Sequence, residues 1–253
     1  MVSDPFSLAG RRAVVTGGNR GIGAAIAFGL ARAGADIISI HRSPEEPSAA
    51  ARVRELGRNY TALRADLSLV DDLTALAEAA IDAHGPVDIL VNNAALQIRH
   101  PAANFPLPDW RLLLDTDLTA AFVLCQAFGR PMLERGRGAI VNVASLLSFQ
   151  GGITVPAYAA AKAGLAGVTR ALANEWAAGG VNVNAVAPGY IATELNTALL
   201  DDPVRGRQIG ERIPAGRWGQ PEDVAGAVVF LCSPAAAYVH GHVLVVDGGW
   251  MGR

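Results

Sequence analysis

The sequence predicts a single doubly wound α/β domain in which helices flank a seven-stranded parallel sheet on both faces. Seven short runs are rich in Val, Ile and Ala and most do not alternate with polar residues, which is the pattern of strands covered on both faces. Segments with a helical spacing of apolar residues lie between these runs, so strands and helices alternate along the chain. No linker, low-complexity tract or internal repeat divides the 253 residues, and this length fits one large domain.

The expected elements follow in regular order. The first strand enters a glycine-rich turn and an alanine-rich helix, the third ends before Asp66, and Asn92 and Asn93 follow the fourth. A long helix then opens at Pro108. The strands are expected at residues 13–16, 36–40, 61–65, 87–91, 139–143, 181–186 and 243–246, and the helices at 22–33, 70–84, 109–134, 157–178 and 221–233.

One segment interrupts this alternation. About thirty residues, 190–220, separate the sixth strand from the last helix, and they are rich in charge, Gly and Pro. Connections of this length in α/β domains are more often lids than plain connections. We therefore interpret residues 190–220 as a substrate lid on one domain that spans residues 1–253.

Composition excludes several classes of function. Lys and Arg number 21 against 23 Asp and Glu, a formal net charge of -2, so we expect no nucleic-acid partner. Hydrophobic residues make up 51% of the chain and charged residues 17%, which excludes disorder as the main state. Cys125 and Cys232 lie in apolar stretches with no second Cys or His at metal-ligand spacing, so neither a metal nor a disulfide framework is expected.

The sequence also bears on where the protein is located in the cell. The first ten residues have neither the basic nor the apolar region of a signal peptide. The uncharged run 138–161 is long enough to span a bilayer, but polar residues and helix breakers occur throughout it. We expect a cytoplasmic protein with no membrane partner.

A glycine-rich turn joins the first strand to the first helix. Gly17, Gly21 and Gly23 let the backbone turn tightly and approach a pyrophosphate, while the helix N-terminus presents free N–H groups to the anion. A merely flexible turn is the alternative, but the strand before and the helix after favour dinucleotide binding. Asn19, Arg20 and Ile22 complete this turn.

Polar residues at later strand ends extend the predicted cleft. Asp66, beside Leu67, offers a carboxylate to an adenine amino group, with a helix N-cap as the equal alternative. Asn93 and Ala94 follow the fourth strand and are small enough to line the cleft without blocking it.

Two arginines bear on the choice of cofactor. His41 and Arg42 follow the second strand, where no acidic residue is present to bind a ribose. Arg42 and Arg20 could bracket a 2′-phosphate, or both could be solvated surface charges. We favour NADP, with NAD as the alternative.

Ser145, Tyr158 and Lys162 form the strongest group of candidate catalytic residues. Tyr158 and Lys162 are four residues apart on one expected helix and therefore share a face. A free tyrosine has a pKa of ~10, and a nearby ammonium favours the phenolate that a general base needs. Ser145 ends the fifth strand and could hydrogen-bond a substrate oxygen. An amphipathic helix whose Tyr and Lys reach toward solvent is the alternative.

Taken together, these residues resemble the short-chain dehydrogenase/reductase family. The match runs from Leu8 to the C-terminus and adds the pair Pro188 and Gly189, in the order and spacing of that family. The resemblance implies a Rossmann fold and hydride transfer with NAD(P), in which Tyr158, Lys162 and Ser145 are catalytic. It also implies cofactor contacts along the whole cleft, at Gly17, Asn19, Arg20, Gly21, Ile22, Gly23, His41, Arg42, Asp66, Leu67, Asn93, Ala94, Tyr158, Lys162, Pro188, Gly189, Ile191 and Thr193.

Several segments are similar to the sugar and polyol dehydrogenases of this family. Ser148 and Gln150, just past Ser145, are expected to hydrogen-bond a polyhydroxylated substrate. Arg99 and His100 lie in the loop after the fourth strand, and either could pair with a sugar-acid carboxylate. Arg99 is favoured because its fork is always charged, and an ordinary exposed arginine is the alternative. The family resemblance and the apolar C-terminal segment 243–251 also imply a homo-oligomer, a tetramer.

Asp117 departs from the family pattern. It stands where the family has an asparagine that positions a water of the proton relay. We expect its carboxylate to pair with Lys162 and to raise the pKa of Tyr158 by cancelling part of the ammonium charge. The main hypothesis is an oxidoreductase that interconverts a secondary alcohol and a ketone on a sugar acid or related polyol. A nucleotide-binding redox sensor with little or no turnover is the alternative, and only Asp117 favours it.

Overall fold

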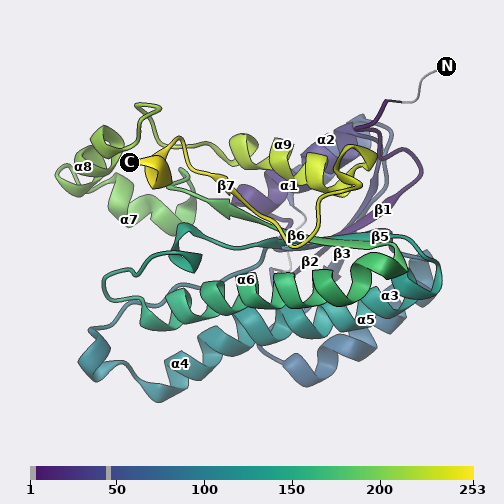
Figure 1. Cartoon of the computed structure of the whole chain (residues 1–253), viewed down its shortest axis with the longest axis horizontal. Coiled ribbons are helices and arrows are strands. Elements are labelled where there is room, and N and C mark those ends of the chain that lie inside the picture. Colours follow the sequence, from purple (N-terminus) through teal and green to yellow (C-terminus); the bar gives the residue numbers. More distant parts are fainter. Residues whose placement is uncertain (1–3, 44–46) are drawn as a thin grey trace.

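A seven-stranded parallel sheet forms the centre of the molecule (Figure 1). The computed structural model describes residues 4–43 and 47–253. The strand order is β3-β2-β1-β4-β5-β6-β7, and all seven predicted strands are confirmed with ends within two residues of the expected ones. Their bounds are Arg12–Thr16 (β1), Asp36–His41 (β2), Tyr60–Arg64 (β3), Ile89–Asn92 (β4), Gly138–Val143 (β5), Val181–Pro188 (β6) and Val243–Val246 (β7).

Helices cover both faces of the sheet and bury two apolar layers. One layer packs the sheet against Gly21–Arg32 (α1), Ser48–Glu55 (α2) and Pro221–Cys232 (α9). The other packs it against Leu73–His84 (α3), Ala120–Glu134 (α5) and Pro156–Trp176 (α6). Burial on both faces explains why most strands are nearly continuous in apolar residues.

The structure also contains helices that the sequence analysis did not assign. The first is α2, which is short and buries only a few apolar side chains, among them Ala49, Ala50 and Val53. Two more lie in the segment 190–220, Thr197–Leu200 (α7) and Arg205–Arg212 (α8). They stand near the C-terminus at one end of the sheet (Figure 1).

The predicted helix 109–134 is interrupted by a π turn. Leu107–Leu114 (α4) passes through the π-helical segment Asp115–Thr119 (η3) into α5. Such bulges are frequent at functional sites, and this one buries Thr116 and Asp117. Within the described residues, 107–134 is the one helix long and apolar enough to cross a membrane, and 56% of its most apolar stretch is buried in the fold.

The strand order places the candidate site. The order reverses between β1 and β4, and in open α/β sheets ligands bind outside the carboxyl ends of the strands at such a point. The segments that follow β1, β4, β5 and β6 carry the predicted site residues, so they meet at one edge.

Candidate active site

The turn after β1 is built to let an anion approach the backbone. Gly17 and Gly21 have φ of 64° and 53°, a left-handed conformation that favours glycine. A Cβ on Gly23 would overlap the carbonyl of Gly17, so only glycine allows α1 to start this close to the turn. α1 begins at Gly21 and directs its free N–H groups at this turn. These features fit the pyrophosphate of a dinucleotide.

Thr16 joins this turn to the end of β4. Its buried hydroxyl oxygen accepts from the backbone N–H groups of Asn93 and Ala94, at 2.9 and 3.0 Å. The Asn93 amide in turn donates to the carbonyl of Thr16 at 2.9 Å. These bonds hold Asn93 and Ala94 beside the glycine turn, where the sequence predicts that they line the cleft. Thr16 was not among the predicted site residues, although its place between β1 and Gly17 is a signal that could have found it.

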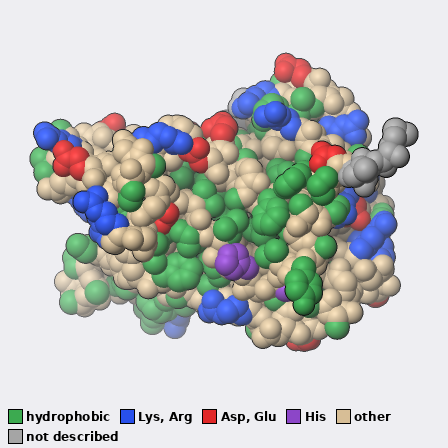
Figure 2. All heavy atoms as spheres, turned by 45° about the horizontal axis from the view of Figure 1, so that its top comes forward, with side chains coloured by type: hydrophobic (Ala, Val, Ile, Leu, Met, Phe, Trp, Pro, Cys, Tyr) green, Lys and Arg blue, Asp and Glu red, His purple; other side chains and the backbone are tan. Residues whose placement is uncertain are grey.

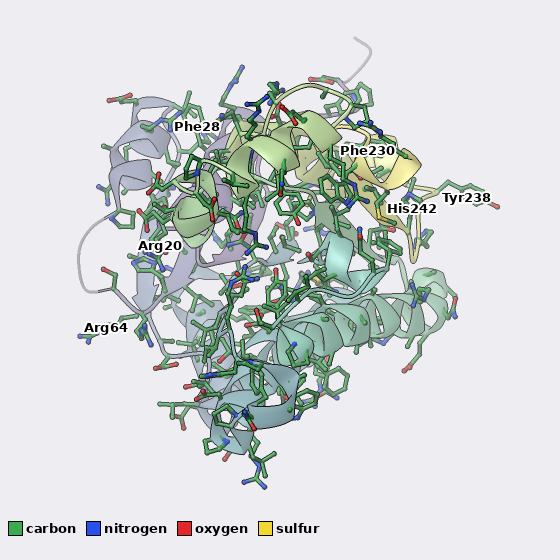
Figure 3. All side chains as sticks on the ribbon, turned by 90° about the vertical axis from the view of Figure 1, so that its left-hand side faces the viewer. Arg20, Phe28, Arg64, Phe230, Tyr238 and His242 are labelled. Carbon is green, nitrogen blue, oxygen red and sulfur yellow. The ribbon has the colours of Figure 1, made fainter. Side chains whose placement is uncertain are left out.

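The end of the cleft beside β2 carries two exposed arginines. Arg42 lies 3.8 Å from the Asp66 carboxylate, and Arg20 lies 2.6 Å from Glu194. Figure 3 views the molecule from the lid end and shows Arg20 and Arg64 on the same side of it. Both ion pairs are largely exposed and contribute little stability, so the guanidiniums can exchange partners for a phosphate.

Two further predicted residues at this end have local roles. Asp66 does not cap a helix, because its Oδ1 accepts from the backbone N–H and hydroxyl of Ser68 in a tight turn. These bonds lower the pKa of Asp66. The buried ring of His41 is hydrogen-bonded to Ser39 at 3.0 Å, and burial lowers its pKa. His41 thus shapes the end of β2 as a neutral side chain.

The segment after β6 crosses the glycine turn. Gly189 packs so closely on Asp247 that a Cβ would lie 2.7 Å from the Asp247 Cα. Ile191 is buried and forms a parallel bridge to Gly219. Thr193 lies against Gly21, where a Cβ would come within 3.6 Å of it. Residues 190–193 therefore cover the predicted phosphate site.

The candidate catalytic residues converge on α6 and the end of β5. Tyr158 and Lys162 are both buried on one face of α6, with the Lys162 nitrogen 5.5 Å from the centre of the Tyr158 ring. The Lys162 ammonium donates to the carbonyl of Val143 at 2.9 Å, which ties it to β5. Ser145 begins a short 3₁₀ turn, Leu146–Ser148, and is hydrogen-bonded to Tyr158. The structure thus brings the three residues together.

Ser148 has a structural role here. Its hydroxyl donates to the carbonyl of Lys162 at 2.7 Å and accepts from the backbone N–H of Ser145 at 3.4 Å. Ser148 therefore connects the turn that carries Ser145 to the helix that carries Lys162. The Ser148 hydroxyl proton is therefore not available to substrate, and the expectation that Ser148 donates a hydrogen bond to it is wrong.

The pKa of Tyr158 differs from the expectation. Burial raises the pKa of Tyr158, the charge of Asp117 raises it further, and the hydrogen bond with Ser145 lowers it. Burial lowers the pKa of Lys162, and Asp117 opposes that change. In the protein alone, the expected lowering of the Tyr158 pKa by Lys162 is therefore not found, because burial and the Asp117 charge outweigh the Ser145 hydrogen bond. The opposing effect of Asp117 has the expected direction.

Asp117 lies beneath this group, buried in the π turn. Its Oδ1 accepts from the backbone N–H of Leu96 at 2.7 Å, while its Oδ2 has no partner among the described residues. Burial raises the pKa of Asp117 to about 6, against the lowering effects of Lys162 and the Leu96 bond. The expected direct ion pair is therefore wrong: the carboxylate and ammonium interact across a gap, because the Leu96 N–H and the Val143 carbonyl hold them apart.

Two predicted substrate residues, Gln150 and Arg99, lie outside the group formed by Ser145, Tyr158 and Lys162. Gln150 donates to the Met251 sulfur at 3.0 Å, which links it to the C-terminal turn. Arg99 is exposed and donates to Gln97 at 3.0 Å. Its neighbour His100 is paired with Asp109 at 2.7 Å, so Arg99 is the more available cation. Among the described residues, no group of three His, Cys, Asp or Glu could hold a metal.

This geometry and the comparisons with known proteins agree. A family model described as enoyl-(acyl carrier protein) reductase matches residues 17–251. The chain belongs to the short-chain dehydrogenase/reductase family, and it is an NAD(P)-dependent oxidoreductase.

Individual relatives cover the whole chain. It is 49% identical over 250 residues to the 2-dehydro-3-deoxy-D-gluconate 5-dehydrogenase of Bacillus subtilis, covering 99% of this chain and 98% of that protein. It is 42% identical to the gluconate 5-dehydrogenase of Gluconobacter oxydans, covering 97% and 96%. The solved gluconate 5-dehydrogenase of Burkholderia cenocepacia, in complex with NADP and tartrate, is 40% identical with a TM-score of 0.94 over 99% and 98% of the two chains.

These findings decide between the two hypotheses. The full-length relatives bear dehydrogenase names, so the redox-sensor alternative gains no support. Solved relatives hold NADP, which agrees with the cofactor favoured from Arg42 and Arg20. The glycine turn fits the pyrophosphate of NADP, and Arg20 and Arg42 fit its 2′-phosphate.

Proposed function

We propose that this enzyme interconverts a secondary alcohol and a ketone at C5 of a sugar acid of the 2-dehydro-3-deoxy-D-gluconate type. The observation that carries the proposal is the convergence of Ser145, Tyr158 and Lys162 beside the phosphate turn. The name of the B. subtilis relative supports the substrate. NADP, when bound, accepts or supplies the hydride.

The chain's own residues handle the proton and the oxygen. Tyr158 gives its hydroxyl proton to the oxygen of a ketone, or takes the proton of an alcohol. Ser145 hydrogen-bonds the same oxygen and stabilises the charge that develops on it. Lys162 supplies positive charge beside Tyr158, and its bond to Val143 fixes its position.

The surrounding segments hold the rest of the substrate. Arg99 binds the carboxylate, since a guanidinium offers a planar fork that fits it. Gln150 hydrogen-bonds a substrate hydroxyl. Residues 190–220 close over the cleft as a lid. The packing of this segment supports the proposal, because Ile209 on α8 and Ile213 just after it join an apolar cluster with Trp250.

The assembly and location extend this proposal. We infer a homotetramer, supported by apolar side chains gathered across the face that carries α9 (Figure 2) and by the fully exposed Tyr238. Figure 3 shows Phe230, Tyr238 and His242 together on the side opposite Arg20. The two buried, free cysteines support a cytoplasmic location.

A panel of substrates tests the proposal. The purified enzyme is assayed with 2-dehydro-3-deoxy-D-gluconate, D-gluconate and neutral polyols, each with NADP⁺ and with NAD⁺, and with a cyclic ketone in the presence of NADPH or NADH. We expect the highest kcat/KM for the first sugar acid with NADP. A clear preference for neutral polyols would overturn the substrate class, and absence of turnover with every compound would overturn the proposed reaction.

A further inference from the structure

One ion pair joins the segment 190–220 to the glycine turn. The Nη1 of Arg20, the residue just before α1, lies 2.6 Å from the Oε2 of Glu194. Glu194 is the first residue of the 3₁₀ turn Glu194–Asn196. The two partners are 174 positions apart in the sequence, so this is a contact between the predicted lid and the predicted cofactor turn.

The backbone on the lid side of this contact is held in place. Thr193 lies against Gly21, where an added Cβ would come within 3.6 Å of its side chain. The backbone N–H of Asn196 donates to the carbonyl of Thr193 at 2.9 Å, and its side-chain amide donates to the carbonyl of Ile191 at 2.8 Å. These contacts place the 3₁₀ turn, and with it the Glu194 carboxylate, beside the glycine turn.

The glycine turn packs on the end of β2. A Cβ on Gly18 would lie 2.8 Å from the Ser39 hydroxyl oxygen, and β2 ends two residues later at His41. In dinucleotide-binding folds the adenosine ribose lies at the end of this strand, and a nearby arginine accommodates a 2′-phosphate. Arg20 in the turn and Arg42 after the strand are the two cations predicted for that phosphate.

Each of these guanidiniums faces a carboxylate. Arg42 lies 3.8 Å from Asp66, which is also held by the N–H and hydroxyl of Ser68. Among the described residues, Arg20 is the one hydrogen-bond donor to the Glu194 carboxylate. Two cations opposite two anions leave no net charge where a phosphate, with more than one negative charge at neutral pH, has to bind. Without Glu194, one positive charge would remain.

We propose that Glu194 is a specificity-determining residue for the cofactor, because it competes with the 2′-phosphate of NADP for Arg20. The phosphate displaces the carboxylate from the guanidinium, whereas NAD has no 2′-phosphate and leaves the ion pair intact. Glu194 therefore weakens the binding of NADP relative to that of NAD. Because coupling between two binding events is reciprocal, NADP in turn releases the 3₁₀ turn of the lid from Arg20.

Dissociation constants of NADPH and NADH, measured by fluorescence titration without substrate, test this proposal. We expect Glu194→Gln to bind NADPH roughly two- to fivefold more tightly, the range of an exposed ion pair, with little change for NADH. The gain is expected to shrink with added salt, because salt screens exposed charges. Unchanged binding of NADPH would overturn the proposal. Weaker binding would also overturn it, since Glu194 would then orient Arg20 for the phosphate.

Two further variants separate this competition from the general charge of the lid. Glu211 pairs with Arg207 at 2.7 Å on α8, and both side chains are exposed, so Glu211→Gln removes the same charge from the same segment. We expect its two dissociation constants to equal those of the wild type. In an Arg20→Gln background, Glu194→Gln is expected to give no further gain for NADPH.

A gain that persists without Arg20, or an equal gain in Glu211→Gln, would overturn the proposal, because Glu194 would then not act through Arg20. Since no substrate is present in these titrations, their outcome is independent of the proposed reaction.

Discussion

Replacing Asp117 by asparagine is expected to change how stability depends on pH. Burial raises the pKa of the folded-state carboxyl from 3.8 to about 6. A group whose pKa is raised on folding contributes stability that is fully present below its unfolded pKa and is lost as pH rises through the folded value. The shift of about two pH units corresponds to about 3 kcal/mol of unfolding free energy, lost between about pH 4 and pH 7.

Asparagine has no such titration. The unfolding free energy of Asp117→Asn, minus that of the wild type, should therefore rise by about 3 kcal/mol across this range. The attraction between Lys162 and the Asp117 carboxylate adds no separate effect, because it operates only where the carboxyl is ionised and already lowers the Asp117 pKa to the value used here.

Urea unfolding at several pH values measures the difference. Protein concentration is held constant because the unfolding of the proposed tetramer would depend on it. Asp115→Asn provides the comparison for a half-buried aspartate on the same turn. If the curves for the wild type and Asp117→Asn run parallel from pH 4 to 7, Asp117 is not the buried, proton-holding group described here.

Five further outcomes follow from the site. Tyr158→Phe should lower kcat by roughly 10² to 10⁴ and leave NADP binding nearly intact by fluorescence titration, and retained kcat would remove Tyr158 as the acid/base. Lys162→Met should lower both kcat and NADP affinity; a loss of only one would show that the ammonium does not serve both purposes. Arg42→Ala should lower kcat/KM for NADP more than for NAD, and equal losses would place the 2′-phosphate elsewhere. Arg99→Ala should raise KM for sugar acids but not for neutral polyols, and equal effects would exclude it from the carboxylate site. In the oxidative direction, Asp117→Asn should move the rising limb of the pH–rate profile toward neutral pH, whereas an unmoved limb would mean that its charge does not reach Tyr158.

The sheet and the main helices could be predicted because their signals are local. Apolar runs without alternation mark buried parallel strands, and the spacing of Tyr158 and Lys162 places both on one helical face. The glycines of the first turn are likewise explained by the backbone at Gly17 and Gly23. Each of these features depends on neighbours in the sequence.

The roles of the other site residues depend on contacts between segments that are distant in the sequence. Ser148 looked available to substrate, but its hydroxyl reaches the carbonyl of Lys162 on another element. Asp117 was expected to touch Lys162, and the Leu96 N–H holds it back. Thr16 gained significance only when the fold placed it against the end of β4. No pattern of neighbouring residues in the sequence encodes contacts between such distant segments.

The most direct test of the central claim is where the hydride comes from. 2-Dehydro-3-deoxy-D-gluconate labelled with deuterium at C5 is oxidised with NADP, and the nicotinamide product is examined by mass spectrometry. The site described here predicts that the deuterium appears on the nicotinamide, and that Tyr158→Phe transfers it roughly 10² to 10⁴ times more slowly at matched cofactor occupancy. Unlabelled nicotinamide product from the wild type, or undiminished transfer by Tyr158→Phe, would contradict it.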